Sequence, residues 1–128
     1  MTLIDTSASI EFFSGHEPIA GLVDGLLQMN EAALCGPVIT ELRRGFRSRS
    51  DRARVLLLMK GCRYLAEPDR IWEEAGDLGF VLREKGLQLK TLDLLIASYA
   101  LAYRCPILSD DRDFLRMNKV GIPLLVLP

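Results

Sequence analysis

Three aspartates stand within four positions near the end of the chain, at Asp110, Asp111 and Asp113. They directly follow a short apolar run, Pro106 to Leu108, which the pattern predicts to be a buried strand. A short helix containing Phe114 is predicted beyond them. One aspartate at such a junction is ordinary helix capping, but three repel one another unless they are solvated, cap a helix or bind a cation. The cluster is therefore the first candidate for a metal site.

Further acids occupy comparable places elsewhere in the chain. Asp5 follows a predicted first strand over residues 2–4, and Thr6 or Ser7 is expected to cap the next helix. Glu41 lies at the edge of the apolar face of a helix predicted to begin at Gly36-Pro37. Asp93 lies in the first turn of a helix that Thr91 is expected to cap. This helix is apolar almost all round, which places it in the middle of a domain.

The elements that must position these acids alternate between short strands and helices, typical of an α/β fold with a mostly parallel sheet covered on both faces. Strands are predicted over 2–4, 32–35, 106–108 and 124–127, with a strand or a connection over 64–66. Helices are predicted around 10–13, 19–29, 36–46, 55–59, 68–86, 91–101 and 114–117. Because ligands bind beyond the carboxyl ends of parallel strands, the acids of four distant segments are expected to converge there.

Carboxylate oxygens without histidine or cysteine suit Mg²⁺ or Mn²⁺. One or two such ions could activate water, orient a phosphodiester and neutralise the charge that develops on the leaving oxygen. The remaining charge fits such a substrate. Six of the 17 acidic residues belong to this set, which leaves 11 acids against 16 lysines and arginines. An acidic site in a basic remainder is what a metal-dependent enzyme acting on a polyanion needs, although an unevenly charged surface is the simpler explanation.

The totals exclude several other classes. The 128 residues predict a single domain, 1–128, and the net charge of −1 argues against a generic nucleic-acid binder. No signal peptide and no apolar run of roughly 20 residues is present, so we expect a cytoplasmic protein without membrane contact. The three cysteines are expected to be buried, reduced thiols. Trp72 and Tyr99 are expected in the core, and no catalytic role is expected for His16.

Four motifs, in order along the chain, carry a family resemblance: Asp5-Thr6-Ser7, Ile39-Thr40-Glu41-Leu42, Leu92-Asp93-Leu94-Leu95-Ile96-Ala97 and Leu108-Ser109-Asp110-Asp111-Arg112-Asp113-Phe114. Each motif alone is weakly specific, but together they resemble the acidic motifs of PIN-domain ribonucleases, and most of all their VapC-type toxin members. The resemblance implies a three-layer α/β/α PIN-like fold and cleavage of RNA with Mg²⁺ or Mn²⁺. It also implies a type II toxin–antitoxin system, with a cognate antitoxin, a homodimer and higher toxin–antitoxin assemblies.

Carried over by position, the resemblance gives catalytic roles to Asp5, Glu41, Asp93, Asp111 and Asp113. Of these, the metal ligands would be Asp5, Asp93, Asp111 and Asp113. Thr6 and Ser109 match hydroxyl residues that hold the carboxylates. Asp110 stands where the family often has a basic residue, so either Asp110 or Asp111 could face the metal, and the spacing to Asp113 favours Asp111.

The arginine-rich stretch from Arg43 to Arg54 admits several interpretations. Arg43, Arg44 and Arg47 could contact RNA phosphates or the antitoxin, and a solvated helix face is the plain alternative.

Other functions remain open from the residues. A catalytically silent RNA- or protein-binding module would keep the fold without the chemistry. A phosphoacceptor receiver domain also gathers aspartates at strand ends, but it expects an acidic pair after the first strand, where Thr6 follows Asp5.

Overall fold

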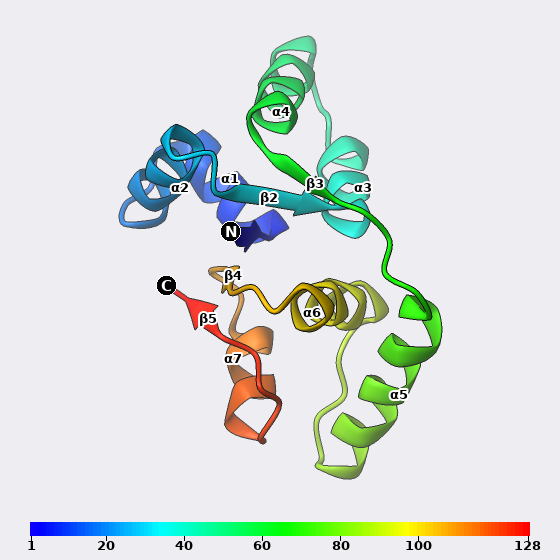
Figure 1. Ribbon diagram of the computed structural model, residues 1–128. Helices are drawn as coiled ribbons and strands as arrows, with labels where there is room; N and C mark the ends of the chain where they lie inside the picture. Colours follow the sequence, from blue (N-terminus) through cyan, green and yellow to red (C-terminus); the bar gives the residue numbers. More distant parts are fainter.

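Five short parallel strands form the centre of the computed structural model, which describes residues 1–128 (Figure 1). In spatial order they are β3 (Arg63–Leu65), β2 (Ala32–Cys35), β1 (Thr2–Ile4), β4 (Ile107–Leu108) and β5 (Val126–Leu127). In register, Leu3 of β1 pairs with Ala33 on one side and with Ile107 on the other. The chain runs outward from β1 through β2 to β3 and then returns to β4, so the order reverses between β1 and β4. In open parallel sheets, ligands bind at this switch point.

Seven helices connect the strands: α1 (Thr6–Ser14), α2 (Ile19–Gln28), α3 (Gly36–Arg44), α4 (Arg49–Gly61), α5 (Ile71–Glu84), α6 (Thr91–Tyr103) and α7 (Arg112–Lys119). Right-handed crossovers place helices on opposite faces when the strand order reverses. In Figure 1, α1–α4 lie in the upper part of the view with β2 and β3, and α5–α7 lie in the lower part with β4 and β5. The expected α/β/α fold with a parallel sheet is therefore confirmed, and every strand pair is parallel.

The core lies between the sheet and its two helix layers. Leu3, Ile4, Ile107 and Leu108 of the central strands are at most 1 % exposed. Strands buried on both faces have near-continuous apolar sequences, which is why these short runs were recognisable. The helix α6 is buried from Leu95 to Ala100, as its apolar sequence predicts. No helix combines the length and the apolar character needed to cross a membrane.

Helix starts differ from the sequence prediction at two places. The side chain of Asp5, rather than that of Thr6 or Ser7, caps α1 by accepting a hydrogen bond from the amide of Ala8. Thr91 is the first residue of α6 and not its cap, because Lys90 holds that position without a side-chain bond. In the first case the helix starts directly after β1, so the last residue before it is the one in capping geometry.

Trp72 was expected in the core and is instead 66 % exposed, whereas Tyr99 is buried as predicted. Helix α5 packs against α6, and only a narrow stripe, Ile71, Ala75 and Leu82, is buried. Trp72 follows Ile71 by about 100° around the helix and so lies beyond the edge of that stripe. The three cysteines are free thiols, and two of them, Cys35 and Cys105, are buried.

Candidate metal centre

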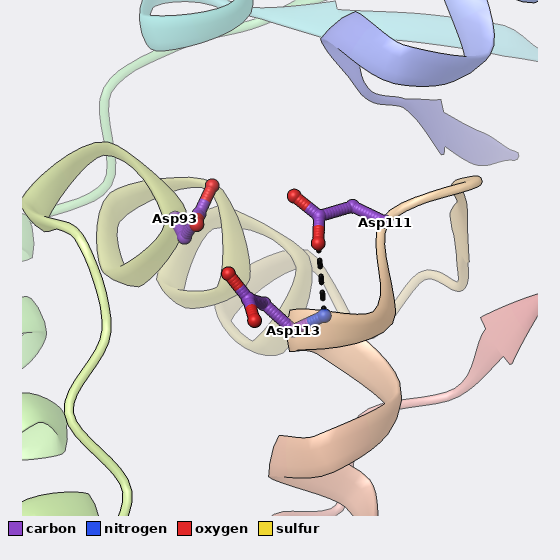
Figure 2. A group of neighbouring side chains, drawn as sticks. All are labelled: Asp93, Asp111 and Asp113. Atoms are coloured by element: carbon purple, nitrogen blue, oxygen red, sulfur yellow. Dashed lines mark hydrogen bonds between the residues drawn. The ribbon is translucent and has the colours of Figure 1, made fainter.

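Three carboxylates meet where α6 begins beside the β4–α7 junction. Asp93, Asp111 and Asp113 each have an oxygen within 4.8 Å of the others (Figure 2). Asp111 caps α7 by accepting a hydrogen bond of 2.9 Å from the amide of Asp113. The capping bond fixes the turn between these two residues. Arg116, one turn further along α7, donates to Asp113 Oδ1 at 3.1 Å and leaves the other oxygen of that carboxylate free.

Asp93 has no such donor. It is partly buried in the first turn of α6, and no hydrogen bond from a neighbouring N–H or hydroxyl group reaches its side chain. Burial above all raises the pKa of Asp93 from 3.8 to about 7, and the charges of Asp111 and Asp113, a side-chain hydrogen bond shared with Asp113, and the charge of Glu41 add to the rise. A carboxylate in this position is stabilised either by a proton or by a cation, because like charges in a poorly solvated site cannot all remain ionised.

Asp5 lies next to this cluster and is held in a different way. Its Oδ2 accepts a hydrogen bond of 2.6 Å from Ser109 Oγ. Its Oδ1 accepts bonds of 2.8 Å from Ser7 Oγ and from the amide of Ala8. Burial raises the pKa of Asp5, while these three bonds oppose the rise, and the nearby charge of Asp111 adds to it. Both oxygens of Asp5 are thus engaged within the protein.

Ser7 is a site residue that the sequence analysis did not assign. Besides donating to Asp5, its hydroxyl accepts a hydrogen bond of 2.9 Å from the amide of Asp110. Ser109 similarly donates to Asp5 and accepts a bond of 2.8 Å from the amide of Asp111. The two serines therefore join the end of β1 to the turn after β4. The only sequence signal for Ser7 was its place in the Asp5-Thr6-Ser7 motif, which does not reveal a partner 103 residues away.

Glu41 approaches the cluster from α3. Thr6 Oγ1 donates a hydrogen bond of 2.7 Å to Glu41 Oε1, which links α1 to α3 beside the acids. The negative charge of Glu41 also contributes to the raised pKa of Asp93, so the two carboxylates lie near enough to repel each other. Glu41 and Asp5 lie outside the set of three whose oxygens approach within 4.8 Å.

The two neighbouring aspartates, Asp110 and Asp111, point to different surroundings. Asp111 belongs to the cluster, whereas the side chain of Asp110 is exposed and only its backbone amide takes part in the hydrogen-bond network. The arginines Arg43, Arg44 and Arg47 are exposed near the end of α3 and do not enter the acidic cluster.

The donor set fits a hard divalent cation. Mg²⁺ and Mn²⁺ prefer carboxylate oxygens and bind commonly through a few carboxylates together with water. Asp93 supplies a carboxylate without a protein donor, Asp111 supplies its Oδ2, and Asp113 supplies the oxygen that Arg116 does not bind. A dication among these three oxygens would compensate both the burial of the Asp93 carboxylate and the repulsion from Asp111 and Asp113, which together raise its pKa.

An acidic cluster at the β1–β4 switch point of this parallel sheet defines a class of protein. The PIN domain profile matches residues 2–120, and the chain belongs to the PIN-domain family. Its sequence is 31% identical over 124 residues to "Ribonuclease VapC21" of Mycobacterium tuberculosis, and the match covers 92% of this chain and 86% of the relative.

Solved structures give the same fold. One similar structure is that of VapBC2 from Rickettsia felis bound to a DNA fragment from their promoter, with a TM-score of 0.80 at 19% identity, covering 98% of this chain and 96% of that one. Another is DNA-bound VapBC from Salmonella typhimurium, with a TM-score of 0.78 at 17% identity and the same coverage. A toxin–antitoxin complex from Klebsiella pneumoniae matches with a TM-score of 0.75 at 20% identity, covering 100% and 97%.

Proposed function

We propose that this protein is an endoribonuclease that hydrolyses RNA phosphodiester bonds with a divalent cation, Mg²⁺ or Mn²⁺, and acts as the toxin of a toxin–antitoxin pair. The observation that carries the proposal is the position of Asp93. In a chain of the PIN family it lies among carboxylates, partly buried, with no hydrogen-bond donor of its own. A cation would compensate this charge, whereas the protein offers the carboxylate only a proton shared with Asp113.

Asp93, Asp111 and Asp113 would hold the ion, and Asp5 and Glu41 would border the same space. When bound, the ion supplies activation of water and neutralisation of charge on the phosphate. The protein supplies the geometry. Ser7 and Ser109 hold Asp5 by donating hydrogen bonds to its carboxylate. They also accept hydrogen bonds from the amides of Asp110 and Asp111, which fixes the backbone that carries the Asp111 carboxylate.

The reaction that this site supports is hydrolysis. Water attacks the phosphorus, the bond from phosphorus to the 3′ oxygen breaks, and the products carry a 5′-phosphate and a 3′-hydroxyl. Glu41, held by Thr6 on the far side of the cluster, is placed to accept a proton or to bind a second ion.

We also propose two protein partners. The solved structures of similar fold include toxin–antitoxin complexes, which supports an antitoxin as a partner in the cytoplasm. Trp72 and Phe80 are 66% and 52% exposed on α5, and this supports a homodimer in which a second copy covers that helix. Sedimentation analysis of the wild-type protein and of Trp72→Ser tests the dimer, since the variant is expected to shift toward monomer.

Cleavage of a fluorescent RNA with and without a chelator tests the proposed chemistry most directly. We expect cleavage in Mg²⁺ or Mn²⁺, no cleavage after chelation, and restored cleavage when either ion is returned. RNA binding without cleavage under all of these conditions would instead indicate a silent binding module. Stable phosphorylation by a small phosphodonor would favour the receiver-domain alternative.

A further inference from the structure

A cleft opens beside the acidic cluster, between α1 and the end of the α3–α4 segment. Its volume is about 580 Å³, within the range of small-ligand sites. Thr6 and Glu41 line one part of it, and these are the two residues joined by the 2.7 Å hydrogen bond next to Asp93. Asp93, Asp111 and Asp113 do not line the cleft, but through Thr6 and Glu41 it reaches the edge of the candidate catalytic site.

Two aromatic rings line the cleft from different segments. Phe13 comes from α1, and Phe46 comes from the connection between α3 and α4. Both are only partly buried, so part of each ring is accessible. The guanidinium of Arg43 lies 5.7 Å from the centre of the Phe46 ring, a cation–π distance that supports this ring from one side. Accessible aromatic rings of this kind are the surfaces on which unpaired RNA bases stack.

The arginines divide into those that line the cleft and those that do not. Arg47 and Arg54 line it, whereas Arg49 and Arg52 are exposed on the same segment outside it. Neither Arg47 nor Arg54 forms an ion pair with a carboxylate. Arg54 donates to the backbone carbonyl oxygen of Phe13 at 3.2 Å, which holds its guanidinium against α1 and leaves further N–H groups available.

One further acid, Asp51, also lines the cleft. It accepts a hydrogen bond of 3.2 Å from the backbone amide of Arg47, and it lies in the first turn of α4, where the helix dipole stabilises a negative charge. Asp51 is thus engaged in holding the backbone of the segment. The segment from Arg43 to Arg54 keeps an excess of positive charge, with six arginines and this single acid.

We infer that this cleft binds the nucleotide of single-stranded RNA next to the scissile phosphate, with its base against Phe13 and Phe46 and a phosphate on Arg47 and Arg54. The inference rests on the proposed ribonuclease function and deepens it by assigning a substrate subsite. A nucleotide combines a flat aromatic ring with an anionic group, and the cleft offers the complement of both beside the acidic cluster. An apolar protein segment would use the rings but would leave the two unpaired guanidinium groups without an anion.

Binding can be measured separately from cleavage. In an Asp93→Asn background, which we expect to be inactive, a short fluorescent single-stranded RNA is titrated with and without Arg47→Gln plus Arg54→Gln. We expect about tenfold weaker binding for that pair, because each arginine makes a charged hydrogen bond to phosphate. The matched control, Arg49→Gln plus Arg52→Gln, removes the same charge outside the cleft and is expected to change binding less than about twofold.

The rings are tested with a substitution that keeps the packing. Phe46→Leu removes the aromatic face while retaining an apolar side chain, and we expect about tenfold weaker RNA binding from the loss of one stacked base. Phe12→Leu is the control, because Phe12 contacts Phe13 but does not line this cleft. Equal losses in the test and control variants would overturn the subsite, even if the wild-type protein cleaves RNA.

Small probes make the result independent of catalysis. Nuclear magnetic resonance spectra of the Asp93→Asn protein are recorded with a nucleoside, with inorganic phosphate and with a nucleoside 5′-monophosphate. The inference expects the monophosphate to shift the signals of Phe13, Phe46, Arg47 and Arg54 more than either fragment does. If phosphate alone gives the full shift, the cleft binds an anion and not a nucleotide, which contradicts the inference. If no signal of these residues shifts, the subsite is overturned as well. Failure of the wild-type protein to cleave any RNA would instead count against the proposed function.

Discussion

Asp5 and Asp93 are two carboxylates of one site, yet the protein treats them in opposite ways. Asp5 is 3% exposed and accepts hydrogen bonds from two serine hydroxyls and one backbone amide. Asp93 is less buried, and its carboxylate lies close to those of Asp111 and Asp113. The difference indicates that Asp5 organises the site from within the protein. Asp93 would instead depend on a cation bound from solution. The roles of the two residues can therefore be separated by experiment.

The largest effect is expected on the rate of RNA cleavage when Asp93 is replaced. We expect Asp93→Asn to lower the rate of RNA cleavage by about 10³-fold or more, because it removes a ligand of the ion that supplies several kcal/mol of charge stabilisation. Cleavage rates and far-ultraviolet circular dichroism of the two proteins provide the measurement. Retained cleavage in a folded variant would remove Asp93 from the mechanism.

The next largest effect is expected on the stability of the fold when Asp5 is replaced. Asp5→Ala removes the cap of α1 and leaves Ser109 and the amide of Ala8 without their acceptor. We expect the free energy of unfolding to fall by about 3 kcal/mol, from the lost cap and the unsatisfied buried donors. Urea unfolding of Asp5→Ala and Asp93→Ala gives the comparison. Similar losses for both variants would contradict the division of roles.

Mg²⁺ should stabilise the folded protein through Asp93 and its neighbours. At a free concentration about tenfold above the dissociation constant, we expect about 1.4 kcal/mol of added stability. Thermal unfolding with MgCl₂ and with a chelator measures this shift. Asp93→Asn should lose most of the shift, whereas Asp110→Asn should keep it, because Asp110 lies outside the cluster.

Ser7→Ala tests the link between the two strand ends. It removes one hydrogen bond to Asp5 and leaves the amide of Asp110 without its acceptor. We expect a loss of about 1 kcal/mol in the free energy of unfolding. Ser50→Ala, at an exposed position in α4, is the control and should be close to neutral in the same urea titration.

The pH dependence of stability in the absence of metal gives a further comparison. The pKa of Asp93 is about 7 in the folded protein against an ordinary 3.8, so the folded state binds the proton more tightly. The contribution of Asp93 to stability should therefore be fully present below about pH 4 and should be lost as the pH rises toward 7. Asp93→Asn should flatten this slope in chelated protein. A slope of the opposite sign, assigned to Asp93 by that variant, would contradict the like-charge environment.

Much of this arrangement could be predicted from the sequence. The strands over 2–4, 32–35 and 106–108 are short apolar runs that end in acids or turn residues, and the parallel sheet follows from their alternation with helices. The preference for Asp111 over Asp110 also matches the geometry of the cluster, since Asp111 caps α7 and Asp110 does not.

The parts that could not be predicted depend on contacts between distant segments. The hydrogen bond between the amide of Asp110 and the Ser7 hydroxyl joins residues 103 positions apart, and no local sequence pattern indicates it. Trp72 fits an apolar helical stripe, yet its exposure depends on how α5 rests on α6. The arginine stretch has one composition, but only the path of the chain places Arg47 and Arg54 in the cleft and Arg49 and Arg52 outside it.

The bonds that join Ser7 and Asp5 to the turn after β4 have a consequence for synthesis of the protein. The bonds from Ser109 to Asp5 and from the amide of Asp110 to Ser7 can form only when both the first ten residues and the segment around Ser109 are present. A growing polypeptide on the ribosome has the first part from the outset but lacks the second until most of the chain has been made. The linked arrangement of the two strand ends therefore forms only late in synthesis, when the segment after β4 has been made.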